Sequence, residues 1–219
     1  QGGVAEEQLA TPDVGAVTRG IVNLQAHLAN LRAYGVPPVV VLNRFPDDSP
    51  DEVAVVRDAA ASEGVAFAES TAFADGAAGA AEVADRAVEV ARTGGHSAPL
   101  YPADATVPAA LDVLVRTVYG GDGADWSEPA RGQLEDLVRV GEGTVPICVA
   151  KTQLSISDDP RRLGRPSGYR VSVRRVERSA GAGFTVVYLG EIETMPGLPK
   201  RPLADRIDVT PDGRIVGMG

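Results

Sequence analysis

Two lysines are the residues of this sequence whose type most suggests contact with a phosphate or another substrate group. Of 21 Lys and Arg residues, only Lys151 and Lys200 are lysines. Lysine offers a compact ammonium that fits where the forked guanidinium of arginine cannot, so both lysines are candidates for a substrate-binding role. The alternative is that both are ordinary surface lysines. The sequence leaves these two interpretations open.

Lys151 follows a short apolar run at residues 145–150, and its neighbour Thr152 invites comparison with a phosphate-binding loop. Such a loop needs the pattern G-x-x-x-x-G-K-[ST], because glycines let successive backbone N–H groups curl around the phosphate while the lysine reaches over it. Residues 146–150 contain no glycine, and no other stretch of the chain supplies the pattern. We therefore interpret Lys151, Thr152 and Gln153 as the polar end of a strand, at the edge of a sheet.

Two phenylalanines lie where two predicted strands end. Phe45 follows a strand at residues 39–42, and Phe73 follows a strand at residues 65–68. Ligands of open parallel sheets bind outside the carboxyl ends of the strands. Two facing rings there would form a slot for a flat heteroaromatic ligand, each stacking contact adding roughly 0.5 to 1.5 kcal/mol beyond its buried area. The alternative is that both rings cover the end of the sheet as ordinary packing. Two polar residues at the same strand ends join them as candidate substrate-binding residues: Asn43 and Ser70.

The remaining acidic residues and histidines form no recognisable catalytic or metal-binding constellation. Four acidic residues cluster around the start of a predicted helix: Asp47, Asp48, Asp51 and Glu52. The last two are better used in the first turn of that helix, where the helix dipole favours negative charge. His27 and His96 are far apart in the sequence, and neither belongs to a Ser, Cys or Asp/His pair of the kind that signals nucleophilic catalysis. The sequence therefore predicts no metal site and indicates no hydrolase triad.

Composition limits both the fold and the partners. With 219 residues, of which 44% are hydrophobic, the chain can bury a full core without a disulfide or a metal, as one large domain or two small ones. Its net charge of −9 would repel nucleic acid and anionic membranes. The single cysteine, Cys148, favours a reducing compartment, and no apolar window is long enough to span a membrane. We therefore expect a cytoplasmic protein that acts on small molecules, with neither a nucleic-acid nor a membrane partner.

Helix and strand patterns alternate along the first part of the chain. The predicted helices cover residues 13–33, 49–62, 77–92, 106–119 and 127–140. The predicted strands cover residues 39–42, 65–68, 145–150, 169–176 and 184–189, followed by a hairpin at 207–216. The alternation is typical of an α/β fold with parallel strands and helices on both faces, whereas the last part indicates a β-rich, antiparallel tail. A glycine-containing connector at 94–103 is a candidate internal domain boundary.

Six segments spread over the chain are more specific than any single residue. In order they are Gly20-x-x-Asn23-Leu24-x-x-His27-Leu28-x-Asn30, GVPPVVVLNRF (35–45), VPICVAKTQLSISDDP (145–160), LGRP (163–166), SAGAG (179–183) and TMPGLPKRP (194–202). Together they resemble the C-terminal part of formate tetrahydrofolate ligase (10-formyltetrahydrofolate synthetase). The resemblance covers essentially the whole chain, and the KTQ and MPGLPK segments are specific to that family.

The resemblance implies an ATP-dependent ligase with a parallel-sheet fold similar to that of P-loop nucleotide hydrolases, and a homotetramer of the full-length protein. In such a ligase, formate is phosphorylated with ATP and Mg²⁺ to formyl phosphate. The N10 amine of tetrahydrofolate then attacks formyl phosphate to give 10-formyltetrahydrofolate. The implied substrates are therefore formate, ATP and tetrahydrofolate, in one-carbon metabolism.

The resemblance also assigns roles to particular residues. In the family, a phenylalanine and a tryptophan at two strand ends sandwich the folate, and Phe45 and Phe73 fall on these two positions. Phe73 departs from the family pattern, because phenylalanine keeps an aromatic face but loses ring area. The resemblance places Lys151, Gln153 and Lys200 in substrate binding without assigning a contact to each.

The family's P-loop and its formyl phosphate residues belong to an N-terminal region that this sequence does not contain. The resemblance therefore implies that residues 1–219 form the C-terminal α/β portion of a larger ligase. The ATP and Mg²⁺ sites would lie mainly on the N-terminal region, and this chain alone is expected to be inactive. The alternative is a stand-alone folate or nucleotide binding module that keeps the fold without the catalysis.

Overall fold

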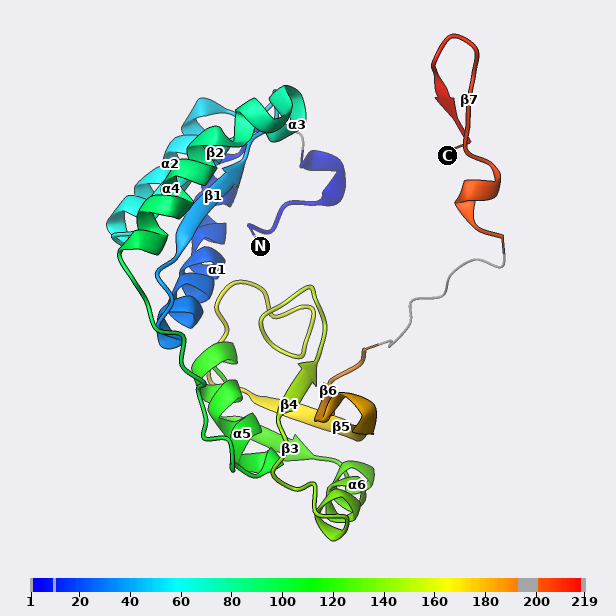
Figure 1. Cartoon of the computed structure of the whole chain (residues 1–219). Helices are drawn as coiled ribbons and strands as arrows, with labels where there is room; N and C mark the ends of the chain where they lie inside the picture. Colours follow the sequence, from blue (N-terminus) through cyan, green and yellow to red (C-terminus); the bar gives the residue numbers. More distant parts are fainter. Residues whose placement is uncertain (1, 10, 193–200, 218–219) are drawn as a thin grey trace.

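The computed structural model describes residues 2–9, 11–192 and 201–217 and shows an α/β protein with its strands in separate sheets (Figure 1). The α-helices are α1 (Val14–Ala33), α2 (Pro50–Ser62), α3 (Ala72–Asp75), α4 (Ala81–Arg92), α5 (Val107–Leu114) and α6 (Glu128–Arg139). The strands are β1 (Val39–Asn43), β2 (Ala66–Ser70), β3 (Gly123–Trp126), β4 (Ile147–Ala150), β5 (Arg170–Ser179), β6 (Phe184–Leu189), β7 (Asp208–Val209) and β8 (Ile215–Val216). Shorter turns are the 3₁₀ segments η1 (Glu6–Gln8), η2 (Gly76–Ala80), η4 (Ala180–Ala182) and η5 (Leu203–Asp205), and the π-helical turn η3 (Val115–Tyr119).

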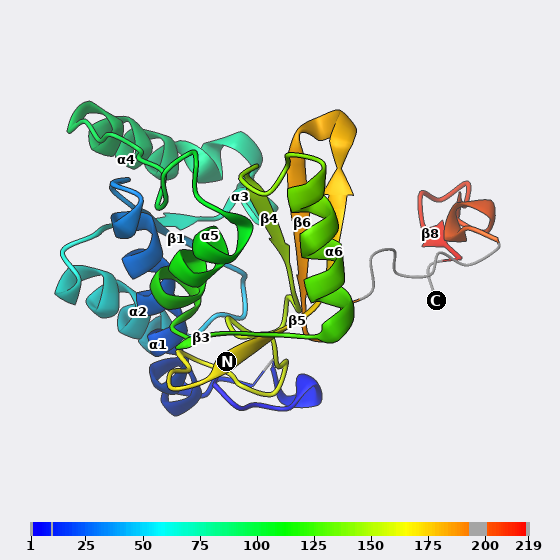
Figure 2. The ribbon, with the colours of Figure 1, turned by 90° about the horizontal axis from the view of Figure 1, so that it is seen from below.

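The first sheet is a parallel pair of strands between helices. In β1 and β2, Val39 lies opposite Ala66 and Asn43 lies opposite Ser70. Figure 2 shows α4 on one side of β1 and both α1 and α2 on the other. The side facing α1 and α2 forms one buried cluster: Leu28, Val40 and Ala60, with Leu24, Val56, Val65 and Phe67 packed against it. The predicted parallel strands with helices on both faces are confirmed for this sheet.

The second sheet is mixed, with the strand order β3-β5-β6-β4. The outer pairs are parallel, and the central pair β5 and β6 is antiparallel, as the pattern of the tail predicts. Helices α5 and α6 both pack on one face, where they form the larger core: Val107, Leu111, Val115, Ala130, Leu137, Tyr169, Val171, Val173, Val176, Val187 and Leu189. The opposite face of β5 exposes Ser172 and Arg174. Within the described residues, the two helices that pack on this sheet therefore lie on one face, and an antiparallel centre allows the other face to stay polar.

Three local predictions also differ from the structure. The helix predicted at 106–119 is α5 followed by the π-helical turn η3, which ends at Gly120 with a positive φ of 75°. The helix predicted at 77–92 begins as the 3₁₀ turn η2 and becomes α4 at Ala81. The strand predicted at 145–150 is the shorter outer strand β4 (Ile147–Ala150), in which Cys148 is exposed.

The C-terminal part contains the expected hairpin. In it, β7 and β8 pair antiparallel, with Asp208 opposite Val216. Residues 193–200, which include the candidate Lys200, lie outside the described residues. Among the helices that the structure describes, none has the length and apolar character needed to cross a membrane.

Candidate functional site

The parallel pairing of β1 and β2 brings the ends of both strands to one place. Asn43 and Ser70 are opposite each other, and the Arg44 N–H donates to the Ser70 carbonyl at 2.8 Å, which extends the ladder by one residue. Immediately beyond this point the rings of Phe45 and Phe73 contact each other, with their centroids 5.2 Å apart and their planes inclined by 55°. The structure thus brings four of the candidate residues together, and their substrate-binding role stays a prediction.

Local hydrogen bonds hold the backbone under each ring. The Phe45 N–H donates to Asp48 Oδ2 at 2.8 Å, and the Asp48 N–H donates to the Phe45 carbonyl at 3.1 Å, which closes a tight turn. The one-turn helix α3, which carries Phe73, follows its N-cap residue Thr71. The Thr71 N–H donates to the Gly79 carbonyl at 3.0 Å, and a Cβ at Gly79 would lie 2.5 Å from the Thr71 carbonyl carbon. Only glycine allows this close approach, so Gly79 fixes the base of α3.

Both rings are exposed, which argues against the alternative that they cover the end of the sheet as ordinary packing. Phe73 is 73% exposed, the highest fraction for any large hydrophobic side chain in the described part of the chain, and Phe45 is 43% exposed. A packing role would bury these rings, since burial is what makes an aromatic side chain favourable in a core. However, the rings touch each other, whereas a ligand between them needs ring planes about 7 Å apart, two van der Waals gaps of about 3.5 Å. The expected slot is closed, and a sandwiched ligand has to separate the rings.

An ion-paired carboxylate supports the end of β2. The Arg44 Nη1 donates to Glu69 Oε2 at 2.6 Å, and Arg57 pairs with the other oxygen of the same carboxylate. The hydrogen bond from Arg44 is the main reason why the pKa of Glu69 is below its ordinary value of 4.5. Arg57 also lies over the ring of Phe67, 5.4 Å from its centroid. This network ties α2 to both strand ends and so helps to position Phe45.

Replacing Glu69 by glutamine should remove a stabilisation that depends on pH. Because the pKa of Glu69 is lowered in the folded chain, its contribution is fully present above pH 4.5 and is lost as the pH falls through the folded pKa. Thermal unfolding should therefore show a lower Tm for Glu69→Gln than for the unmodified chain at neutral pH, and a shrinking difference at acid pH. Glu135→Gln is the control, since no arginine pairs with Glu135 in the described ranges. A Tm difference that stays constant with pH would contradict this prediction.

A second group of candidates lines a polar cavity of about 300 Å³. The cavity lies between the second half of α1, the turn η3 and the loop that follows β4. Its lining residues are Asn23, His27, Asn30, Val118, Tyr119, Lys151, Gln153, Ser155 and Ile156. Figure 1 shows this loop between α1 and the second sheet. The structure therefore brings Lys151 and Gln153 together in a cavity of their own, which shares no lining residue with the phenylalanine pair.

Lys151 is held inside this cavity by neutral groups. Its Nζ donates to the Thr152 carbonyl at 3.0 Å and to the Ser155 carbonyl, and it lies 5.5 Å from the centroid of the Tyr119 ring. Burial lowers the pKa of the Lys151 ammonium and raises the pKa of the Tyr119 hydroxyl to about 12. The lysine is thus a half-buried cation, and its substrate-binding role stays a prediction.

Two buried serines shape the loop that presents Lys151. The Ser157 Oγ donates to the Asp159 carbonyl at 3.0 Å and accepts from the Asp159 N–H at 3.1 Å. The Ser155 Oγ lies 3.1 Å from the Ser157 Oγ and accepts from the Ser157 N–H at 3.0 Å. These hydroxyls replace the backbone ladder that a strand would supply. No pattern in the sequence indicated this role, since serine in a polar stretch is equally typical of an exposed loop.

Two side-chain amides of α1 bond to backbone carbonyls on the turn η3 and on the loop between β4 and β5, around the same cavity. The Asn30 Nδ2 donates to the Val118 carbonyl at 3.1 Å, and the Asn23 Nδ2 donates to the Gly164 carbonyl at 3.3 Å. Reasoning from the sequence missed both asparagines and Tyr119 as cavity residues, because their partners lie far away along the chain, 88 positions from Asn30 and 141 positions from Asn23. The resemblance of the α1 segment to the family was the only signal that pointed to Asn23 and Asn30.

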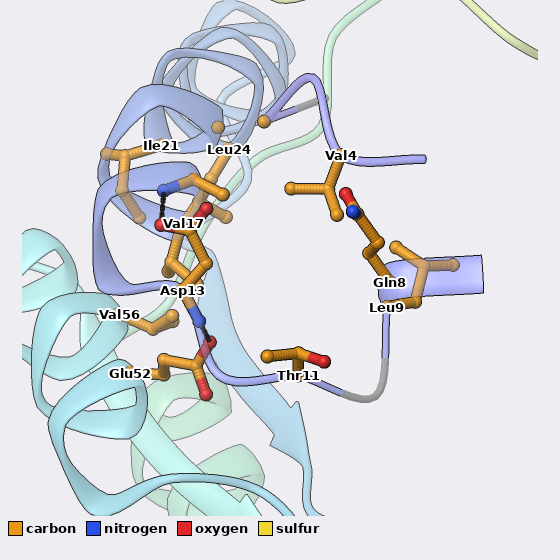
Figure 3. Close-up of a pocket in the computed structure, with 13 residues that line it drawn as sticks. Val4, Gln8, Leu9, Thr11, Asp13, Val17, Ile21, Leu24, Glu52 and Val56 are labelled. Atoms are coloured by element: carbon orange, nitrogen blue, oxygen red, sulfur yellow. Dashed lines mark hydrogen bonds between the residues drawn. The ribbon is translucent and has the colours of Figure 1, made fainter. Parts of the chain in front are cut away.

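A larger cavity of about 410 Å³ lies under the N-terminal segment (Figure 3). Val4, Gln8 and Leu9 form one wall, and the start of α1 forms the opposite wall. Its two carboxylates are already engaged. Asp13 Oδ1 accepts the N-cap hydrogen bond from the Ala16 N–H at 2.8 Å, and Glu52 Oε1 accepts from the Asp13 N–H at 2.7 Å. The cavity therefore offers mainly apolar walls and was not indicated by the sequence.

The described residues do not fit ATP or Mg²⁺. Lys151 follows a strand without the glycine cradle that would wrap a phosphate, and its ammonium already donates to two carbonyl groups. Within the described ranges, no three His, Cys, Asp or Glu side chains are grouped so that they could hold a metal ion. In the acidic cluster near α2, the carboxylates of Asp48 and Glu52 each accept a hydrogen bond from a backbone N–H group. No step that involves ATP or Mg²⁺ can be assigned to these residues.

Comparison with known proteins gives one consistent result. A family model described as formate–tetrahydrofolate ligase matches residues 1–219. A formate–tetrahydrofolate ligase of Thermus thermophilus is 43% identical over 213 residues, which cover 97% of this chain and 39% of that protein. This chain thus spans about two fifths of the length of the curated relative it matches. Because the family model matches the whole of residues 1–219, the chain belongs to the formate–tetrahydrofolate ligase family.

Proposed function

We propose that this chain is the C-terminal part of an ATP-dependent ligase that forms 10-formyltetrahydrofolate, and that it contributes the folate-stacking wall. The observation that carries the proposal is the exposed aromatic pair of Phe45 and Phe73 at the ends of two adjacent parallel strands. The polar edge formed by Asn43 and Ser70 lies directly beside the pair, where it could bond the heteroatoms of a pterin ring. Family membership supports the choice of ligand.

The geometry indicates how a pterin ring would enter. The rings must move apart by about 2 Å or more to admit a flat ring between them, since their centroids are 5.2 Å apart and a sandwich needs about 7 Å. Phe73 is the better candidate to move, because its ring is 73% exposed on the single helical turn α3, whereas Phe45 is 43% exposed and belongs to the turn bonded through Asp48. We therefore assign the opening movement to Phe73 and the fixed face of the site to Phe45.

The chemical step is proposed to take place with groups from the N-terminal region of the ligase. In this reaction a formate oxygen bonds to the γ-phosphorus of ATP, ADP leaves, and the resulting formyl phosphate accepts the N10 amine as phosphate departs. The chain described here would bind and orient the pterin so that N10 faces the formyl carbon, and we assign none of its residues a catalytic role. ATP and Mg²⁺ would bind mainly on the N-terminal region.

A stand-alone binding module without catalysis is the second candidate. The observation that favours it is that the described residues contain no nucleotide-binding loop, so the chain could have kept folate binding without the chemistry. The homotetramer, the cytoplasmic location and the domain boundary at 94–103 stay predictions under either proposal.

Isothermal titration calorimetry and a complementation assay together test the proposed function. The chain should bind tetrahydrofolate weakly and ATP not measurably, and alone it should form no 10-formyltetrahydrofolate from formate and ATP. Adding the N-terminal region of a family member should restore formation of the product. Tight binding of ATP to this chain would contradict the assignment of the nucleotide site. Folate binding without any restored activity would favour the stand-alone module.

A further inference from the structure

Lys151 carries a positive charge for which the cavity supplies no anionic partner. Its two hydrogen bonds go to the backbone carbonyls of Thr152 and Ser155, and its other close neighbour is the Tyr119 ring. No carboxylate lies within ion-pair distance of its Nζ in the described part of the chain. Removing a charge from water is costly unless an opposite charge or several hydrogen bonds replace the water.

Asp158 is the carboxylate that acts electrostatically on Lys151, but it accepts a hydrogen bond from another residue. Asp158 acts to raise the pKa of Lys151, but the larger effect of burial lowers it. The Asp158 Oδ2 accepts from the Ser172 N–H at 2.7 Å, so this carboxylate faces β5. Tyr119 stays neutral because burial raises its pKa to about 12. An ammonium has three N–H donors, and the structure accounts for two of them.

Side chains that can donate hydrogen bonds lie around the cavity beside Lys151. The exposed side chains of Gln153 and His27 line it together with Lys151. The volume of about 300 Å³ is roughly that of ten water molecules, at about 30 Å³ each, so a carboxylate or a phosphate group fits. A compact ammonium beside amide and imidazole groups is an arrangement that favours an oxyanion.

We propose that this cavity binds an oxyanion, either a carboxylate or a phosphate group, with Lys151 as its charged partner and with Gln153 and His27 as neighbouring donors. The cavity lies against the second half of α1, whereas the phenylalanine pair lies beyond the ends of β1 and β2. The inference therefore does not rest on the folate-stacking proposal, and either can fail without the other.

Proton NMR of the two histidines tests this site directly. His27 lines the cavity and His96 does not, so His96 is an internal control. Titration with sodium formate and, separately, with inorganic phosphate should move the His27 ring resonances saturably, while the His96 resonances stay in place. Sodium chloride at equal ionic strength controls for screening. The tighter of the two anions identifies the ligand class as a carboxylate or a phosphate.

Two variants separate binding by Lys151 from effects on folding. Lys151→Met should lower the affinity for the anion that binds saturably by about tenfold or more, since a hydrogen bond to a charged group is lost. Gln153→Ala removes an exposed side chain. This variant should weaken binding of the anion about two- to fivefold and leave the fold intact. The proposal is overturned if neither anion shifts His27 saturably in the unmodified chain, or if both variants retain full affinity. Phe45→Ala should leave the anion affinity unchanged, which keeps this test distinct from the folate proposal.

Discussion

Replacing Phe45 by alanine is expected to weaken binding of tetrahydrofolate by about 1 to 3 kcal/mol, or about five- to 150-fold in Kd. Phe45 forms the fixed side of the aromatic pair, because the turn bonded through Asp48 holds its backbone. Its removal deletes the ring face on which a pterin would stack, together with the apolar area that the pterin would bury. Calorimetric titration of both proteins with tetrahydrofolate measures the difference.

Two further variants make the result interpretable. Val138→Ala removes another exposed apolar side chain, from the distant helix α6, and should leave folate binding unchanged. Phe73→Trp restores the ring that the resemblance associates with this position and should tighten binding, because indole offers a larger stacking surface. If Phe45→Ala instead lowers the Tm and leaves the folate affinity as it was, the ring is a packing residue and the stacking proposal fails.

The meeting of Phe45 and Phe73 could be predicted because it depends on local patterns and one general rule. Continuous apolar runs mark β1 and β2, and a helix between them requires parallel strands. The carboxyl ends of parallel strands meet at one edge of the sheet, so residues just beyond them become neighbours. The direct contact between the rings could not be predicted in this way. It depends on the turn at Asp48 and on the close approach of Gly79 to Thr71.

The polar cavity shows where prediction from sequence fails. Lys151 was a candidate because lysine is rare in this chain, and that reasoning identified a half-buried cation. Its surroundings depend on contacts between distant segments, such as the Asn30 amide with the Val118 carbonyl. The turn η3, which places Tyr119 over the lysine, reads in the sequence as the continuation of a helix. No periodic pattern distinguishes a π-helical turn at the end of a helix from the helix itself.

Strand β3 was missed for a similar reason. Its sequence, Gly-Ala-Asp-Trp at 123–126, lacks the run of β-branched residues that marks a strand. It forms because it pairs with β5, and the Arg170 Nε, at 2.7 Å from Asp125 Oδ1, adds a bond across that pair. Its tertiary partner decides the conformation of this segment, so the mixed order of the second sheet was not predictable from single segments.

The largest expected effect on stability belongs to Leu111. This side chain is fully buried in the core of the second sheet, so Leu111→Ala should destabilise the chain by about 2 to 5 kcal/mol through lost burial and the cavity left behind. If the connector at 94–103 is a domain boundary, the loss should be confined to the second sheet. Urea denaturation measures the free energy, and hydrogen exchange followed by mass spectrometry locates the loss.

Leu28→Ala is the matched control, because Leu28 is 3% exposed in the separate core beside β1. Hydrogen exchange should rise in β5 and β6 for Leu111→Ala and in β1 and β2 for Leu28→Ala. The hydrogen bonds of Asn23 and Asn30 link α1 to the turn η3 and to the loop between β4 and β5. They should transmit only a small part of either destabilisation, since each neutral hydrogen bond contributes about 1 kcal/mol. An equal rise in exchange across both sheets for either variant would show one cooperative unit. The two cores would then unfold together, and the boundary at 94–103 would be wrong.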